Sequence, residues 1–324
     1  MYQIKELQAL VNKEIENRKI GREPMSLYEP INYTLSNGGK RIRPLLTLMA
    51  CNVFSENIDQ AVDAALAIEV FHNFTLLHDD IMDKADIRRG KPTVHKKWNE
   101  NTAILSGDAM FIKAYEYLFK CKSARFNQII EVFNNTALEV CEGQQYDMEF
   151  ESRNNVTEQE YLRMIELKTS VLLAAALKIG ALIGGADDKD ADLMYDFGRN
   201  IGLAFQIQDD LLDVYGDTKT FGKEIGGDIV ANKKTFLLIK AKELADKDKK
   251  GVLENLLINT ENSRSEKVKK VTEIYNELKI KDVSEKLIAD LHQKAIECLQ
   301  EVSASSEKKN ELLSLAESLI QRSN

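Results

Sequence analysis

Apolar residues recur along most of this chain at the three- and four-residue spacing of amphipathic helices, as in Ile4, Leu7, Val11 and Ile15. Strand-like alternation with hairpin turns is missing, and no proline follows Pro92. Because proline breaks helix interiors, the rest of the chain can form long helices. The pattern predicts an all-α fold. We expect residues 21–30 to be a connection, residues 236–324 to hold amphipathic helices, and the remaining helices to cover residues 1–20, 45–54, 61–82, 102–120, 127–148, 158–180 and 193–215.

No repeat, low-complexity stretch or boundary interrupts the 324 residues, which predicts a single domain over residues 1–324. The net charge of −8 and a pI near 5.3 argue against a general nucleic-acid surface. The N-terminal residues lack the apolar core of a signal sequence. The apolar run 171–186 is short for a transmembrane segment and contains Lys178. Four scattered cysteines follow no zinc spacing. We therefore expect a soluble, cytoplasmic protein with reduced thiols.

The most informative stretch ends the helix predicted over residues 61–82, where Asp79, Asp80 and Asp83 form an Asp-Asp-x-x-Asp pattern. On a helical wheel Asp79 and Asp83 share a face with Thr75 and His72, and the two aspartates lie roughly 6 Å apart along the axis. Carboxylates this close repel each other unless a cation lies between them. Mg²⁺ binds one or two carboxylates and completes its shell with water and substrate phosphate. The stretch therefore predicts a magnesium site.

A second copy of the pattern occurs at Asp209, Asp210 and Asp213, and Gln206 shares the face of Asp209 and Asp213. The aspartate content of the chain predicts roughly 0.1 chance matches to this pattern. One match alone could be a solvated helix end. Two matches, both ending apolar helices, indicate a shared chemical role.

Basic residues gather in segments that could bind phosphate. Lys40, Arg41 and Arg43 follow Gly38 and Gly39, which is typical of an anion-binding loop, although a turn with a solvated basic face has the same composition. The loop over residues 86–92 contains Arg88 and Arg89, which suit bidentate phosphate binding; a charge-balanced surface loop is the alternative.

Three further features are ambiguous from the residues alone. Lys168 and Thr169 interrupt an apolar helix face, so they need a partner, either a substrate anion or an internal carboxylate such as Glu166. The Gly-rich segment 222–235 carries Lys223 and Lys233 and could cover a phosphate or be an ordinary loop. His72 shares the acidic face, where a core histidine is the alternative.

These motifs, in this order, resemble the trans-type isoprenyl diphosphate synthases, also called polyprenyl synthetases, over essentially the whole chain. The resemblance implies an all-α bundle around a deep central cavity and a homodimer. It also implies a reaction that joins isopentenyl diphosphate to an allylic diphosphate, with three Mg²⁺ ions present when substrate is bound. A terpene cyclase of the same fold and a non-catalytic regulatory subunit are the alternatives, but each normally lacks one intact acidic motif.

The resemblance implies roles for the motif residues. The expected Mg²⁺ ligands are Asp79, Asp83 and Asp209, with Asp80, Asp210 and Asp213 as further ligands or as acceptors behind them. Lys168 and Lys223 are expected to join the aspartates in catalysis. The allylic diphosphate is expected to contact Arg88, Lys168, Thr169, Gln206, Lys223 and Lys233. Isopentenyl diphosphate is expected to contact Lys40, Arg43, His72 and Arg89.

The residues before Asp79 bear on product length. In the family, an aromatic residue at the fifth position before the first aspartate, here Phe74, limits growth to short products. A second barrier is often present in enzymes that stop at fifteen carbons, but Thr75 is small and the acidic motif has no insertion. The resemblance therefore implies a twenty-carbon product, with fifteen carbons second. On an ideal helix Phe74 points about 140° from Asp79, so packing in the core is its alternative role.

Overall fold

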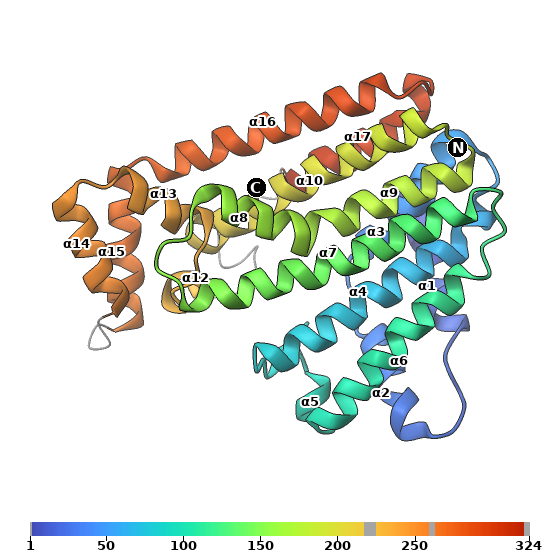
Figure 1. Cartoon of the computed structure of the whole chain (residues 1–324), viewed down its shortest axis with the longest axis horizontal. Helices are drawn as coiled ribbons and strands as arrows, with labels where there is room; N and C mark the ends of the chain where they lie inside the picture. The colour runs from blue at the N-terminus through green and yellow to red at the C-terminus, as the bar shows by residue number, and fades with distance from the viewer. Residues whose placement is uncertain (1, 217–224, 259–262, 321–324) are drawn as a thin grey trace. The chain divides into compact units, whose positions relative to one another are not determined.

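The computed structural model of the chain describes residues 2–216, 225–258 and 263–320. Within these residues the only strands are β1 (Ile87–Arg88) and β2 (Lys91–Pro92), which pair antiparallel with Ile87 opposite Pro92. Every other regular element is a helix (Figure 1). The prediction of an all-α fold is therefore confirmed.

The chain divides into two compact units. Unit 1 comprises the described residues of Met1–Asn134, Ala175–Tyr195 and Glu301–Leu312, and unit 2 those of Asn135–Ala174, Asp196–Gln300 and Leu313–Asn324. The helices wholly in unit 1 are α1 (Ile4–Asn17), α2 (Met25–Ser36), α3 (Ile42–Phe54), the 3₁₀ helix η1 (Ile58–Ala61), α4 (Val62–Met82), α5 (Val94–Lys97) and α6 (Glu100–Leu118). Those wholly in unit 2 are α8 (Glu158–Ile165), the π-helix η2 (Glu166–Ser170), α12 (Gly227–Val230), α13 (Phe236–Leu244), α14 (Lys247–Ile258) and α15 (Arg264–Glu277). The longer helices with residues in both units are α7 (Phe126–Ser152), α9 (Val171–Gly184), α10 (Asp188–Tyr215), α16 (Ile280–Glu301) and α17 (Ser306–Ile320).

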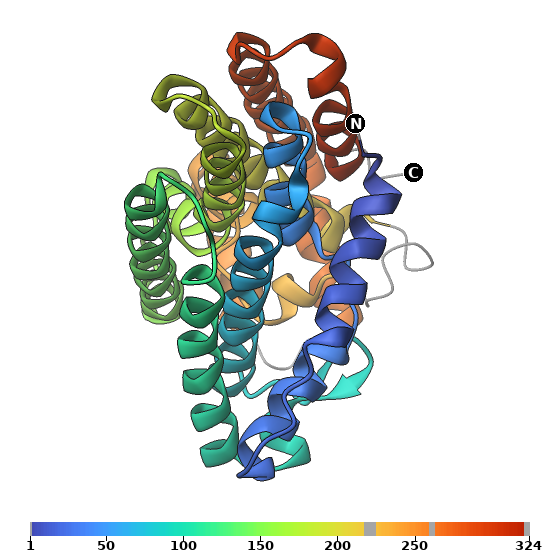
Figure 2. The same ribbon diagram turned by 90° about the vertical axis from the view of Figure 1, so that its right-hand side faces the viewer.

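Helices α3 and α4 form the core of unit 1. Every residue of α3 from Pro44 to Val53 is buried, as expected for a helix that is apolar on all sides. Helix α4 packs along α6 (Figures 1 and 2) and ends at Met82, so it delivers the first acidic motif to the helix end predicted from sequence.

Helix α2 differs from the sequence-based prediction, which treated residues 21–30 as a connection. It begins at Met25 and contains Pro30, a residue that removes one backbone donor and usually breaks a helix. Here Tyr28, Pro30 and Ile31 are all buried, and α2 packs against α6. The packing of this apolar face therefore outweighs the local cost of the proline.

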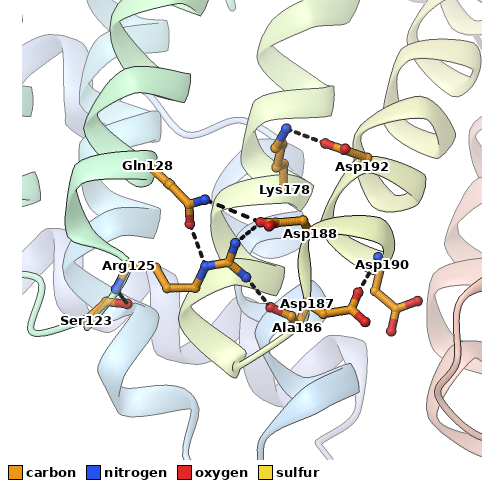
Figure 3. A network of polar contacts seen from close by, with 9 residues as sticks. All are labelled: Ser123, Arg125, Gln128, Lys178, Ala186, Asp187, Asp188, Asp190 and Asp192. Carbon is orange, nitrogen blue, oxygen red and sulfur yellow. Dashed lines mark hydrogen bonds and ion pairs between the residues drawn. The ribbon is translucent and has the colours of Figure 1, made fainter.

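A polar network ties together three segments of unit 1 (Figure 3). The guanidinium of Arg125, just before α7, donates to the backbone oxygen of Ala186 at 2.5 Å and pairs with Asp188 at the start of α10. Close by, the buried carboxylate of Asp190 accepts hydrogen bonds from the backbone N–H, at 3.0 Å, and the hydroxyl of Ser303. These bonds hold the α9–α10 turn against the start of α7 and the segment before α17.

Unit 2 has its own apolar core, built by residues from α7, α8, α10 and α12 to α16, including Phe150, Phe236 and Tyr275. One continuous helical path runs through α8, η2 and α9. The π-turn η2 interrupts it at Glu166–Ser170, where Lys168 and Thr169 lie. Such turns inside α-helices often occur at functional sites.

The same path, Glu158–Gly184, is the one described helix that is long and apolar enough to cross a membrane. Within its most apolar window 78% of the residues are buried inside the structure. That burial is what a core helix shows.

Candidate active site

In unit 1, the residues predicted for isopentenyl diphosphate come together around the loop before α3. A guanidinium nitrogen of Arg43 lies 3.2 Å from His72 Nε2 on α4. Arg89, at the tip of the β1–β2 hairpin, donates a hydrogen bond to the backbone oxygen of Gly38. Lys40 is exposed in the same loop. Tertiary folding thus brings together three segments that are distant in the sequence.

The cluster is strongly electropositive. Burial lowers the pKa of His72 well below its ordinary value, and the charges of Arg43, Arg89, Arg88 and Arg41 lower it further, so this imidazole is neutral near pH 7. Burial also lowers the pKa of Arg43 to about 10, and the neighbouring Arg89 acts in the same direction. Positive charges held this close favour an anion between them.

A narrow cleft beside this cluster is lined by Asn37, Asn73, Asp80, Arg88 and Arg89, among others. Three buried polar atoms here, Asn37 Oδ1, Asn73 Oδ1 and Arg43 Nε, have no hydrogen-bond partner within the described ranges. Buried polar groups normally have partners. Arg43 Nε is the donor among the three, and beside excess positive charge it fits a ligand that carries phosphate oxygens, whereas the two asparagine oxygens are acceptors.

The three aspartates of the first motif have different surroundings. Asp79 is partly buried, whereas Asp83 is exposed at the end of α4, and the backbone N–H of Asp83 donates to the backbone oxygen of Asp79 at 2.8 Å. Asp80 is only 5% exposed and accepts a hydrogen bond from Arg88 Nε at 2.7 Å. Burial raises the pKa of Asp80, against the opposing effect of Arg88. Asp79 and Asp83 are therefore the pair suited to a metal, while Asp80 holds Arg88.

In unit 2, four of the six residues predicted for the allylic diphosphate line a cavity of about 640 Å³. Lys168, Thr169, Gln206 and Lys233 all border it, together with Asp210. Arg88, predicted for the same substrate, lies in unit 1 beside Arg89. Lys223 lies outside the described residues.

The π-turn residues have partners in this cavity. Lys168 Nζ lies 2.5 Å from Asp147 Oδ2 on α7, and the hydroxyl of Thr169 donates to Gln206 Oε1 at 3.3 Å. The sequence predicted either a substrate anion or an internal carboxylate such as Glu166 for Lys168. The partner is a carboxylate, but Glu166 instead pairs with Arg163, at 3.3 Å. Asp147 was not predicted as the partner of Lys168, although it lies at the polar end of the helix predicted over residues 127–148.

Asp210 is buried at the wall of this cavity, with 5% of its surface exposed. Its carboxylate accepts hydrogen bonds from the Tyr161 hydroxyl and, at 3.2 Å, from the Phe236 N–H. Burial raises the pKa of Asp210 to about 7, although these hydrogen bonds oppose the shift. The surroundings of Asp210 suit an internal acceptor. Tyr161 is a residue that sequence reasoning missed.

Asp213 and Asp209 complete the second motif. Asp213 Oδ2 accepts the Asp228 N–H at 3.0 Å and so holds the start of α12. Asp209 is partly buried in α10. Within the described residues, no three His, Cys, Asp or Glu side chains converge to hold a metal by themselves. The carboxylate pair at the end of α4 and the carboxylate of Asp209 nevertheless fit Mg²⁺, because this ion takes few protein ligands and fills its shell with water and phosphate.

Phe74 packs in an aromatic cluster between α4 and α6. Its ring stacks on Phe111 with centroids 5.2 Å apart, and it meets the edge of His78 at 4.8 Å. The ring is only partly buried. Thr75 donates its hydroxyl to the His72 backbone oxygen at 2.8 Å. Phe74 therefore packs between the helices, as in its alternative role, although the residue is not fully buried.

Comparisons with known proteins show the family to which the chain belongs. The family model of the polyprenyl synthetases matches residues 24–278. The chain is 41% identical to a geranylgeranyl diphosphate synthase of Sulfolobus acidocaldarius over 96% of this chain and 95% of that protein. It is 45% identical to a geranylgeranyl diphosphate synthase of Methanosarcina mazei over 74% of this chain and 75% of that protein.

A solved structure gives the same result. The crystal structure of a geranylgeranyl pyrophosphate synthase matches with a TM-score of 0.95 and 46% identity over 100% of both chains. The sequence-based prediction of a short-chain prenyltransferase is thereby confirmed. On its fold, its motifs and these matches, the chain belongs to the polyprenyl synthetase family.

Proposed function

We propose that this enzyme joins isopentenyl diphosphate to allylic diphosphates in the presence of Mg²⁺ and releases a twenty-carbon trans-prenyl diphosphate. One observation carries the proposal. Basic side chains lie beside an aspartate of each acidic motif: Arg88 and Arg89 with Asp80 in unit 1, and Lys168 and Lys233 with Asp210 in unit 2. An enzyme with two diphosphate substrates needs both groups of basic side chains, whereas a cyclase needs one.

The reaction follows from the chemistry of the substrates. The carbon–oxygen bond of the allylic diphosphate breaks, the allylic carbon bonds to the alkene carbon of isopentenyl diphosphate, and a proton then leaves the resulting cation. The proposed ligands of Mg²⁺ are Asp79, Asp83 and Asp209. When bound, the ion would stabilise the negative charge that develops on the leaving diphosphate. Lys168 and Lys233 add fixed positive charge in the unit 2 cavity. The departing diphosphate can accept the proton, so a dedicated catalytic base is unnecessary.

The other substrate is assigned to the unit 1 cluster of Lys40, Arg43, His72 and Arg89. Arg43 Nε, without a protein partner in the described part of the chain, is a donor available to phosphate. A neutral His72 can also donate one hydrogen bond. These groups would hold isopentenyl diphosphate by its charged end and leave its double bond free to approach the allylic carbon.

Product length is assigned to Phe74. Its stack on Phe111 holds the ring in place, while its partial exposure leaves a surface that a growing chain could meet. Thr75 adds no second aromatic barrier. We therefore propose twenty carbons as the main product, with fifteen as the alternative.

We further propose a cytoplasmic homodimer in which residues 1–324 act as one domain. A row of exposed apolar residues along α6 favours a dimer. Leu105, Ile112 and Phe119, the last just after the helix end, recur every seven residues and are 60%, 63% and 67% exposed. A row of this kind is typical of an interface. Four free cysteines, with Cys51 and Cys121 buried, suit a reducing compartment.

Diphosphate release tests the proposed function. The enzyme is incubated with Mg²⁺ and with isopentenyl diphosphate, an allylic diphosphate, or both. Release that requires both substrates supports condensation. Release from the allylic substrate alone would show a cyclase, and no release under any condition would leave only a regulatory role.

A further inference from the structure

Arg41 lies between two residues assigned to isopentenyl diphosphate, Lys40 and Arg43, yet its own side chain is turned into the protein. The residue is 7% exposed. One guanidinium nitrogen pairs with Glu69 on α4, and another donates to the backbone oxygen of Leu35 at the end of α2. A single side chain therefore links the basic loop to two helices.

Glu69 is itself held firmly. It is 2% exposed, and the Asn73 amide donates to both its Oε1, at 2.7 Å, and its backbone oxygen, at 2.8 Å. Its charge also attracts Arg43 and Arg89, the neighbouring guanidinium groups of the cluster. Glu69 thus provides a buried negative charge inside a group of arginines that otherwise repel one another.

The backbone of the loop has an uncommon conformation at Arg41. Arg41 has φ +49° and ψ +37°, a left-handed conformation that is uncommon for a residue with a side chain, and it is the residue from which α3 begins. Gly39, at φ +122°, lies so near Arg89 that a Cβ atom there would be 2.7 Å from its guanidinium carbon. The turn that separates Lys40 from Arg43 is therefore fixed at Arg41, where a surrounding contact must hold an unfavourable backbone conformation.

We propose that Arg41 and Glu69 are positioning residues for isopentenyl diphosphate: their buried ion pair fixes the left-handed turn and so sets Lys40 and Arg43 in place before the substrate binds. The pair touches no substrate in this account. The inference rests on the proposed function, because it assigns the unit 1 cluster to isopentenyl diphosphate. Removing the charge of Glu69 has two opposite effects on the affinity for isopentenyl diphosphate. The site becomes more positive, which favours binding, but the loop loses its anchor, which weakens binding. If the pair positions the loop, the second effect must be the larger.

The test compares Arg41→Gln, Glu69→Gln and the conservative Arg41→Lys with wild type. Arg18→Gln is the matched control, because Arg18 also pairs with a carboxylate of α4, Asp63, but carries no part of the loop. Binding of isopentenyl diphosphate to each free enzyme is measured by calorimetry, together with KM for both substrates and the thermal unfolding midpoint. Arg41→Gln and Glu69→Gln should weaken isopentenyl diphosphate binding at least tenfold and change the allylic KM less than twofold.

Arg41→Lys keeps the positive charge and tests the positioning role if the other two variants do not fold. It should show an intermediate loss of isopentenyl diphosphate binding, since an ammonium cannot reach Glu69 and Leu35 with the same fork. Arg18→Gln should match wild type. Equal increases in both KM values, or tighter isopentenyl diphosphate binding in Glu69→Gln, would overturn the proposal. Absence of isopentenyl diphosphate binding by the wild-type enzyme would instead refute the proposed function.

Discussion

Gly143 is the point at which α7 touches the π-turn that carries Lys168. A Cβ atom added there would lie 2.7 Å from the carbonyl carbon of Leu167 and from the Cα of Lys168, and closer still to the Lys168 nitrogen. Ordinary contacts to a Cβ are 3.4–4 Å, so Gly143→Ala must push two helix backbones apart by about 1 Å. Because the obstacle is backbone, no side-chain rotation can relieve it.

Gly251→Ala is the control, because Gly251 lies within α14 and has nothing within 4 Å of the same position. Both substitutions gain about 1 kcal/mol of helix propensity. Only Gly143→Ala adds the cost of overpacking, about 1–3 kcal/mol, so this should be the difference in stability between the two variants. Displacement of Lys168 from its place beside Asp147 should also raise the allylic KM more than that for isopentenyl diphosphate.

The assay combines thermal unfolding with steady-state kinetics on both variants. Gly143→Ala should melt below wild type or close to it, whereas Gly251→Ala should melt above. If the two variants share the same unfolding midpoint and the same allylic KM, then Gly143 does not fix the π-turn and the reasoning is refuted.

Asp79→Ala should reduce turnover by orders of magnitude while circular dichroism still shows a folded protein, since removing one of two clustered charges relieves repulsion; near-normal turnover at saturating Mg²⁺ would reject its role as a ligand. Arg43→Ala should raise KM for isopentenyl diphosphate more than for the allylic substrate, and an equal rise in both would indicate a general structural role. Phe74→Ala should lengthen the dephosphorylated products by one or more five-carbon units. An unchanged distribution of product lengths from an active variant would show that another residue limits chain growth. The pKa of Asp210, raised to about 7, means that the folded state keeps this proton to higher pH than the unfolded state, so its stabilising contribution is present below about pH 4 and is lost as the pH rises through 7. In the absence of metal, this titration should lower the unfolding free energy of wild type by about 2–3 kcal/mol between pH 5 and pH 8. Asp210→Asn should lack that decrease, and identical pH slopes for the two proteins in denaturant unfolding would contradict the assignment.

Local sequence was sufficient for the helices that position the site. The apolar spacing over residues 61–82 and the charged end at Asp79 required no tertiary information, because a long buried helix is visible in its own residues. Helix α2 was missed for the complementary reason. Its proline argues against a helix, and only the burial of Tyr28 and Ile31 against another element reverses that preference.

The partners of the site residues could not be predicted in the same way. Arg41 and Arg43 have the same charge and lie two residues apart, and only the partner Glu69, 28 residues from Arg41, shows which one is turned inward. Lys168 likewise pairs with Asp147 at a separation of 21 residues, and it lies in a π-turn that has no clear sequence signal. Such pairings depend on how helices cross, which periodicity alone does not determine.

The length of the product distinguishes the proposed condensation from its alternatives. The enzyme is incubated with Mg²⁺, isopentenyl diphosphate and a short allylic diphosphate, and the products are dephosphorylated and sized by chromatography beside alcohols of known length. The main product should be a linear twenty-carbon alcohol, formed only when both substrates are present. A cyclised hydrocarbon formed from the allylic substrate alone, or a main product far longer than twenty carbons, would contradict the proposed function.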